Sequence, residues 1–272
     1  MQGTLRKMTT RLDDVVQYDL PVGDTALPLN PLIGQPLSLH FLGQIFCQAC
    51  GRKTKKSFSQ GYCYPCMNKL AACDMCILKP EKCHYEQGTC REPEWADNHC
   101  MVNHIVYLAN TSGLKVGITR ETQVPTRWMD QGATQALPIF RVSSRLDSGL
   151  VEVSFTDFVA DKTAWQAMLK GANEDLDMAA ERDRLVALAE EQVEALLEDR
   201  GLDPISALSG ADVVSIDYPV LEYPVKVKSL TFDKQPSVSG TLMGIKGQYL
   251  ILDTGVLNIR KFSGYKVQVD FR

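Results

Sequence analysis

The chain has 272 residues, of which 44% are hydrophobic and 23% charged, and its formal net charge is −4. This length and balance are typical of an ordinary globular protein of about two domains, and the net charge argues against a generally basic nucleic-acid-binding protein. No run of 18 uncharged apolar residues occurs, and the first residues lack an apolar signal core. We therefore expect a cytoplasmic protein that does not enter membranes.

The first 46 residues form a β-rich leading segment. Short β-type runs occur at 15–20, 37–41 and 45–46, and Pro and Gly separate them. Their apolar alternation is weak, so we expect this segment mainly to pack against another part of the chain.

The strongest chemical signal is a group of nine cysteines between Cys47 and Cys100. A chain that is not exported keeps its thiols reduced, so paired CxxC motifs favour metal over disulfides. Each CxxC motif forms a knuckle that turns its two thiolates to one point, and two knuckles complete a closed tetrahedral site. We predict a structural zinc ion bound by Cys47, Cys50, Cys63 and Cys66.

The loop between the two knuckles is basic and interleaved with aromatic residues. Such a loop can follow a phosphate backbone while its aromatic rings stack on bases, although lysines at a ribbon tip can also serve solubility alone. The candidate nucleic-acid-binding residues are Arg52, Lys53, Lys55 and Lys56.

A second cysteine cluster follows the ribbon and predicts a second structural zinc site. Spacing alone does not select its ligands, and an iron–sulfur cluster would use the same thiolates. The set we predict is Cys73, Cys76, Cys83 and Cys90, with Cys100, His84 and His99 as alternatives.

Residues 104–152 form the block around which the rest of the chain is organised. Two β-type runs, 105–109 and 114–119, flank a turn of Asn, Thr, Ser and Gly, which predicts a hairpin. A short helix is expected to start at Pro125. Glu152 is expected early in a following amphipathic helix whose apolar residues are Val151, Phe155, Phe158 and Val159.

This block resembles the GIY-YIG nuclease superfamily. The residues that carry the resemblance are Tyr107 in the first strand, the element Lys115-Val116-Gly117 in the second, Arg127 on the short helix and Glu152. More closely, the stretch from about Cys47 to Lys170 is similar to a bacterial family of uncharacterised cysteine-rich proteins that carry a GIY-YIG-like domain.

The resemblance implies a catalytic role for each matching residue. Tyr107 would position or deprotonate the attacking water, and Arg127 would hold the scissile phosphate. Glu152 would hold one Mg²⁺ that stabilises the leaving oxygen. Lys115 stands where the family has a second tyrosine; a cationic amine can contact phosphate but is a poor general base at neutral pH.

The last hundred residues divide into a helical segment and a β-rich end. The helix expected at 174–197 has an acidic face formed by Glu190, Glu194 and Glu198, which is either solvated or meets a basic partner. From residue 212 onward six short strands, one of them at 225–230, suggest a small barrel. The segment 1–46 could complete this barrel and bring the termini together.

The sequence thus predicts an α+β protein. Its expected parts are a β-rich leading segment (1–46), a zinc-ribbon-type cysteine module (47–100), a GIY-YIG-like domain (101–170), a helical segment (171–205) and a small β-barrel (206–272). The predicted function is a zinc-containing protein that binds DNA or RNA and could be a Mg²⁺-dependent nuclease. The alternatives are a non-catalytic nucleic-acid-binding module and a protein-interaction scaffold. The sequence leaves the oligomeric state open.

Overall fold

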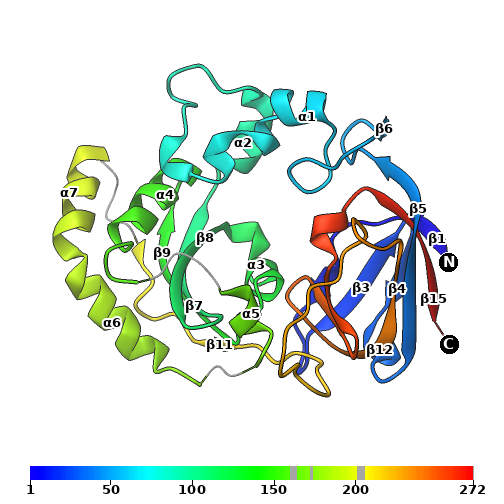
Figure 1. Ribbon diagram of the computed structural model, residues 1–272. Coiled ribbons are helices and arrows are strands. Elements are labelled where there is room, and N and C mark those ends of the chain that lie inside the picture. The colour runs from blue at the N-terminus through cyan, green and yellow to red at the C-terminus, as the bar shows by residue number, and fades with distance from the viewer. Residues whose placement is uncertain (160–163, 172–173, 201–205, 272) are drawn as a thin grey trace.

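The structure, a computed structural model, describes residues 1–159, 164–171, 174–200 and 206–271. It contains a β body made from both ends of the chain, a central domain, and a cysteine module that lies at the rim between them (Figure 1). Within the described residues, no helix is long and apolar enough to cross a bilayer.

The β body joins the leading segment to the C-terminal strands. Its main sheet runs in the order β1-β15-β5-β12-β13-β14, with β6 paired to β5. A second, three-stranded sheet has the order β2-β3-β4. The strands are β1 (Gln2–Thr4), β2 (Thr9–Arg11), β3 (Gln17–Val22), β4 (Thr25–Pro28), β5 (Pro36–Phe46), β6 (Lys53–Thr54), β12 (Ser237–Lys246), β13 (Tyr249–Leu252), β14 (Gly255–Asn258) and β15 (Tyr265–Phe271).

Strand β5 is the centre of this body. It pairs antiparallel with β12 on one side and with β15 on the other, so β12 and β15 are not hydrogen-bonded to each other. The sequence suggested two short runs here, but the structure has one strand of 11 residues. The Met1 ammonium donates to the Val269 carbonyl at 2.7 Å, which confirms that the two termini lie together.

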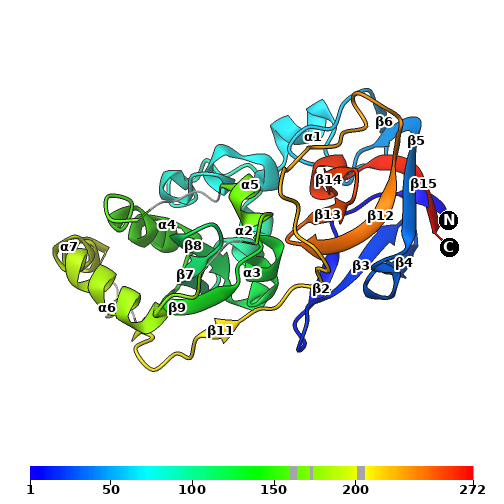
Figure 2. The same ribbon diagram turned by 60° about the horizontal axis from the view of Figure 1, so that its bottom comes forward.

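The central domain contains a five-stranded antiparallel sheet of order β10-β9-β7-β8, with β11 also paired to β9. The predicted hairpin is confirmed, with Tyr107 opposite Gly117 in the register. Figure 2 shows the chain after residue 207 passing along this sheet as β11 before it enters the β body. The strands are β7 (His104–Asn110), β8 (Leu114–Arg120), β9 (Gln135–Val142), β10 (Ser206–Ala207) and β11 (Val214–Ser215).

Several elements of the second half differ from the sequence expectations. The helix expected at 174–197 is two helices that meet at Ala189. The strand expected at 225–230 is reduced to one isolated bridge at Ser229. The helices around the central sheet are α3 (Thr126–Asp130), α4 (Arg145–Ser154), α5 (Trp165–Met168), α6 (Met178–Leu188) and α7 (Glu190–Arg200), with a 3-10 helix η5 (Glu121–Gln123).

The cysteine module, residues 47–103, consists of short helical turns and loops. None of its residues belongs to the three hydrophobic cores of the described structure. The module therefore depends on something other than apolar burial for its order. Its helices are α1 (Tyr64–Lys69), α2 (Pro93–His99) and the single-turn 3-10 helices η2 (Ala71–Cys73), η3 (Met75–Ile77) and η4 (Pro80–Lys82); η1 (Asn30–Leu32) and η6 (Arg260–Phe262) belong to the β body.

Candidate functional site

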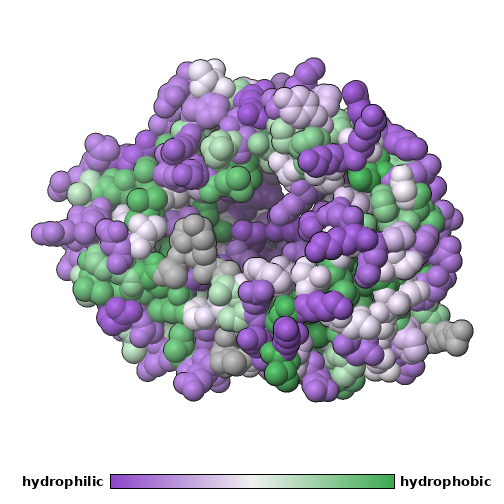
Figure 3. Space-filling view, viewed as in Figure 1, coloured by the Kyte–Doolittle hydropathy of each residue, from purple (hydrophilic) through white to green (hydrophobic). Residues whose placement is uncertain are grey.

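A cavity of about 540 Å³ lies where the cysteine module, the central sheet and η6 of the β body meet. Figure 3 shows a hollow with hydrophilic walls at the centre of the face seen in Figure 1. Strand β8 supplies one wall of the cavity, from Lys115 to Arg120, and the module supplies another through residues such as Ile77 and Trp95. All three parts of the molecule contribute to this single space.

The cavity is strongly cationic, although the whole chain is acidic. Two carboxylates line it, Asp130 and Glu152. Against these stand six cationic side chains, from Lys7, Lys115, Arg120, Arg127, Arg145 and Arg260. Like charges concentrated in a concave, poorly solvated space raise the local potential and attract an anion. The basic cavity can therefore hold a polyanionic ligand.

Three of the four predicted catalytic residues meet at this cavity. Lys115 comes from β8, opposite Ala109 in the hairpin, and Arg127 comes from α3. Glu152 also lines the cavity, but it lies in the last turn of α4 rather than early in its helix. The sequence misplaced this helix start because a capping signal was missed. The Ser144 hydroxyl caps the helix by accepting from the Asp147 amide at 3.1 Å.

Tyr107 lies behind the wall of the cavity and is completely buried. Its hydroxyl donates to the side-chain amide oxygen (Oε1) of Gln131 at 3.0 Å. Burial raises the pKa of Tyr107 to about 12, a rise that the nearby Arg127 guanidinium only partly opposes. The phenol therefore stays protonated at neutral pH, which suits a residue that positions its neighbours better than a proton acceptor.

The remaining cations of the cavity were missed by sequence reasoning. Arg145 is the first residue of α4, and its guanidinium donates to the Ile77 carbonyl of the cysteine module at 2.7 Å. Burial lowers the pKa of Arg260, and the Arg127 guanidinium nearby lowers it further. Arg145 comes from the middle of the chain and Arg260 from near its C-terminus, and no local pattern marks either of them.

Asp130 connects the cavity to the β body. Its carboxylate accepts from the Lys7 ammonium at 2.7 Å and from the Gln248 amide at 2.8 Å. Gln248 also exchanges two hydrogen bonds with the backbone of Met8. These contacts hold Asp130 in place and tie this side of the cavity to the β body.

A stacked pair of rings borders the cavity on the side of the module. Trp95 and His99 lie parallel, with centroids 4.0 Å apart and planes inclined by 9°. His99 also contacts the Trp95 carbonyl through Nδ1 at 2.8 Å. This arrangement makes His99 part of an aromatic platform beside the cations. Flat rings in such a place suit the face of a nucleobase.

The first cysteine site agrees with the predicted zinc ligands. The sulfur atoms of Cys47, Cys50, Cys63 and Cys66 all lie within 4.8 Å of one another. The Cys50 and Cys63 sulfurs are 3.8 Å apart, close to the edge of about 3.8 Å that a tetrahedron with Zn–S bonds of about 2.3 Å requires. Burial raises the pKa of Cys47, but amide groups of Cys50 and Cys63 outweigh it and lower the value to about 6. The thiolate of Cys47 is thus favoured, whereas hydrogen bonds from the neighbouring thiols raise the pKa of Cys66 to about 12. The close spacing of the four sulfur atoms is what makes this group able to bind zinc.

The predicted nucleic-acid-binding residues lie on the loop between Cys50 and Cys63, outside the cavity. Their side chains are all exposed. Arg52 contacts the Cys50 thiol, which raises the pKa of its guanidinium. The four residues are Arg52, Lys53, Lys55 and Lys56.

The second cysteine cluster departs from the predicted ligand set. Cys76, Cys83 and Cys90 line one small space together with Cys100, which the sequence had kept as an alternative. Cys73 lies elsewhere, with its thiol against the Ser59 side chain, because η2 ends there and the chain turns before η3 begins.

Fold and site together define an α+β protein with a cysteine module over a basic cavity. A model of the family described as protein of unknown function (DUF2797) matches residues 34–267. The chain belongs to this family. The matched span runs from before β5 into β15 and includes both cysteine clusters and most of the cavity. No curated protein and no solved structure matches the chain.

Proposed function

We propose that this protein binds DNA or RNA, with a backbone phosphate held in the basic cavity, and that Cys47, Cys50, Cys63 and Cys66 bind a structural zinc ion. The observation that carries the proposal is the gathering of six cations around one cavity in a chain of net charge −4. Phosphate contacts by Lys and Arg supply most of the affinity in such complexes. Arginine is suited to them because its planar fork matches two phosphate oxygens.

Two further features support a nucleic acid rather than a small anion. The stacked Trp95 and His99 lie beside the cations, where a base attached to the bound phosphate could stack. The exposed basic loop from Arg52 to Lys56 adds charge outside the cavity. A single inorganic phosphate would use neither feature.

A second candidate function is hydrolysis of the bound phosphodiester. Water would attack phosphorus, one P–O ester bond would break, and the products would be a phosphate monoester and a hydroxyl group. Arg127 and Lys115 would hold the phosphoryl oxygens, and Tyr107 would keep Arg127 in place through its buried hydroxyl. A Mg²⁺ ion bound by Glu152 would supply additional charge neutralisation.

Binding is tested by fluorescence anisotropy with labelled single-stranded and duplex DNA and RNA over a range of salt concentrations. Arg127→Ala should weaken binding roughly tenfold or more, because a charged hydrogen bond is lost. It should also reduce the slope of log K against log salt by about 1. The matched control is Lys234→Ala, which removes one exposed cation outside the cavity and should change neither quantity appreciably. Equal effects of the two variants would refute the site.

Hydrolysis is tested by incubating the protein with Mg²⁺ or Mn²⁺ and mixed DNA and RNA, beside Glu152→Gln and Tyr107→Phe. Cleavage that both variants lose while they retain binding would support the nuclease. An equal background from all three proteins would leave a binding module without catalysis. Failure to bind any nucleic acid would favour the scaffold hypothesis, with the acidic side chains of α7 as the contact surface.

A further inference from the structure

Four cysteines of the second cluster surround one small space in the cysteine module. Cys76 comes from η3, Cys83 ends η4, Cys100 ends α2, and Cys90 lies in the loop between η4 and α2. The space measures about 10 Å³, room for a single water or small ion. Four cysteines from four separate turns therefore line a volume of the size of one ion. No three of their sulfur atoms lie within 4.8 Å of one another, so an ion bound there would draw the thiols closer together.

The segment that carries these cysteines has almost no apolar core. Between residues 71 and 100 the buried residues are two alanines, a proline and Cys100. Ordering each residue costs backbone entropy, and these few side chains cannot offset that cost for thirty residues. Small segments in this position are held by disulfides or by metal, and the reduced thiols found here suit metal.

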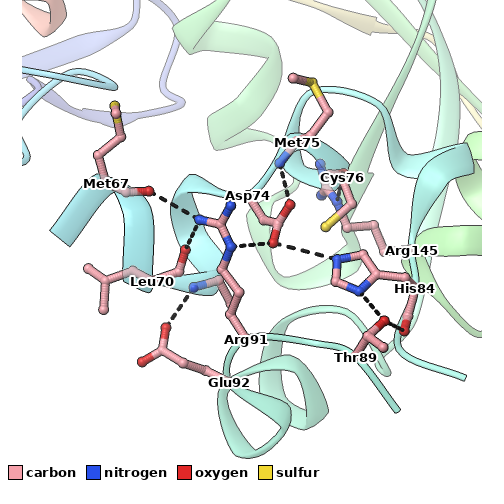
Figure 4. A network of polar contacts seen from close by, with 11 residues as sticks. Met67, Leu70, Asp74, Met75, Cys76, His84, Thr89, Arg91, Glu92 and Arg145 are labelled. Atoms are coloured by element: carbon pink, nitrogen blue, oxygen red, sulfur yellow. Dashed lines mark hydrogen bonds and ion pairs between the residues drawn. The ribbon is translucent and has the colours of Figure 1, made fainter. Parts of the chain in front are cut away.

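A rival ligand set lies close by, but two of its three members, Asp74 and His84, already have other partners. Ligand atoms of Asp74, Cys76 and His84 lie within 4.8 Å of one another. Figure 4 shows the Asp74 carboxylate between Arg91, whose Nε donates at 2.6 Å, and His84 at 3.5 Å. Asp74 also caps η3 by accepting from the Met75 amide. A metal ion there would stand beside the Arg91 guanidinium, so this network is better explained as the frame of the module.

The charge around the four cysteines favours a site of net negative charge. The Arg145 side chain reaches into the module, where its guanidinium donates to the Ile77 carbonyl, and its main-chain amide donates to the Cys100 carbonyl at 2.7 Å. A divalent ion with four thiolates carries a net charge of −2 and would compensate this guanidinium.

We propose that a second thiophilic divalent ion of the zinc class is bound by Cys76, Cys83, Cys90 and Cys100. This ion is separate from the zinc ion predicted at the first cysteine site, which begins at Cys47. This ion joins η3, η4 and α2 and so fixes the wall of the basic cavity that carries Ile77, Trp95 and His99. The proposal does not depend on nucleic-acid binding, because it concerns the order of the module alone.

The first test is the metal content of the purified full-length chain. Elemental analysis should give two zinc ions per chain. Cys83→Ser and Cys90→Ser should each leave one, whereas Cys73→Ser, the matched control in the same module, should retain two. Loss of an ion from Cys73→Ser, a single ion in the wild type, or iron with visible absorbance would overturn the assignment.

The second test uses the unchanged chain, so it holds even if a variant fails to fold. Alkylation of each cysteine is followed by mass spectrometry before and after removal of metal with a chelator. Cys73, Cys83 and Cys90 are all partly exposed. Cys83 and Cys90 should react slowly before chelation and at least tenfold faster after it, while Cys73, which binds no ion, should already react readily before chelation. Equal behaviour of the three thiols would refute the site.

Discussion

Gly117 and Tyr107 face each other across the hairpin, and the glycine makes room for the phenol. A Cβ atom at Gly117 would lie 2.9 Å from both Cζ and the hydroxyl of Tyr107. Gly117→Ala should therefore displace the buried ring and break its hydrogen bond to Gln131. We expect a loss of roughly 1–3 kcal/mol in the free energy of unfolding, measured by urea denaturation.

The control for this substitution is Gly210→Ala. No atom lies within 4 Å of a Cβ built at Gly210, and its backbone is not in the left-handed region. The free energy of unfolding should change by no more than about 0.5 kcal/mol. Similar losses for the two alanine variants would mean that the contact between Gly117 and Tyr107 is not what restricts position 117.

His104 gives the central domain a pH dependence of known sign. The ring is completely buried, Nδ1 contacts the Val102 carbonyl at 2.7 Å, and Nε2 has no partner in the described structure. Burial lowers the pKa of His104 from 6.5 to about 4. Below pH 6.5 the unfolded chain therefore binds a proton that the folded chain does not, and stability falls as the pH falls towards 4.

From pH 7 to pH 5, His104 should account for a loss of about 2 kcal/mol in the free energy of unfolding. The measurement is urea denaturation at both pH values for the wild type and for His104→Asn, whose amide can keep the bond to Val102. The variant should lose less stability over this interval than the wild type. Equal losses would show that other groups cause the pH dependence.

At the scale of elements, α4 and the cysteine module touch with no space between them. A Cβ atom at Gly149 would lie 2.5 Å from the Pro80 side chain and 2.6 Å from the Glu81 amide. In an isolated helix Gly→Ala would stabilise by about 1 kcal/mol, but here the added methyl group meets backbone. Gly149→Ala should separate η4 from α4 and destabilise the protein.

The readout for Gly149→Ala is amide hydrogen exchange. Amides of residues 76–84 should exchange faster than in the wild type, while those of β7 should keep their protection. Gly210→Ala again serves as the control and should leave both regions unchanged. Unaltered exchange in the module would mean that η4 does not depend on its contact with α4.

The sequence predicted elements best where the signal is local. The hairpin follows from four turn residues between two β-type runs, and the first metal site follows from two CxxC knuckles. The start of α4 was not predicted because apolar spacing alone does not mark the helix cap at Ser144. The position of Cys73 was missed because spacing does not reveal the direction in which a single-turn helix points its side chain.

The basic cavity could be predicted only in part, because some of its lining residues are brought together only when the two ends of the chain pair. Lys115, Arg127 and Glu152 lie within one supersecondary unit, so a resemblance could place them together. Lys7 and Arg260 reach the same space only because the two ends of the chain pair in one sheet. Long-range strand pairing leaves no periodic trace in the sequence, and the cationic surplus of the cavity is hidden in a net charge of −4.

The pairing of β5 with β12 and β15 also determines how residues 206–272, which the sequence suggested as a separate domain, should behave when expressed alone. Within it, β12 and β15 are joined only through β5, which comes from the leading segment. Expressed alone, residues 206–272 would leave these two strands with unpaired edges and their buried side chains exposed. We expect this fragment to show no cooperative unfolding transition and little dispersion of its amide proton resonances.

The matched control is a permuted chain that consists of residues 206–272 followed, through a short Gly/Ser linker, by residues 1–46. The linker can be short because the Met1 ammonium lies 2.7 Å from the Val269 carbonyl. With β5 restored between β12 and β15, this permuted chain should unfold cooperatively in urea and show dispersed resonances, since the buried faces of the main sheet regain their neighbours. A folded 206–272 fragment, or a permuted chain as disordered as that fragment, would contradict the central position of β5.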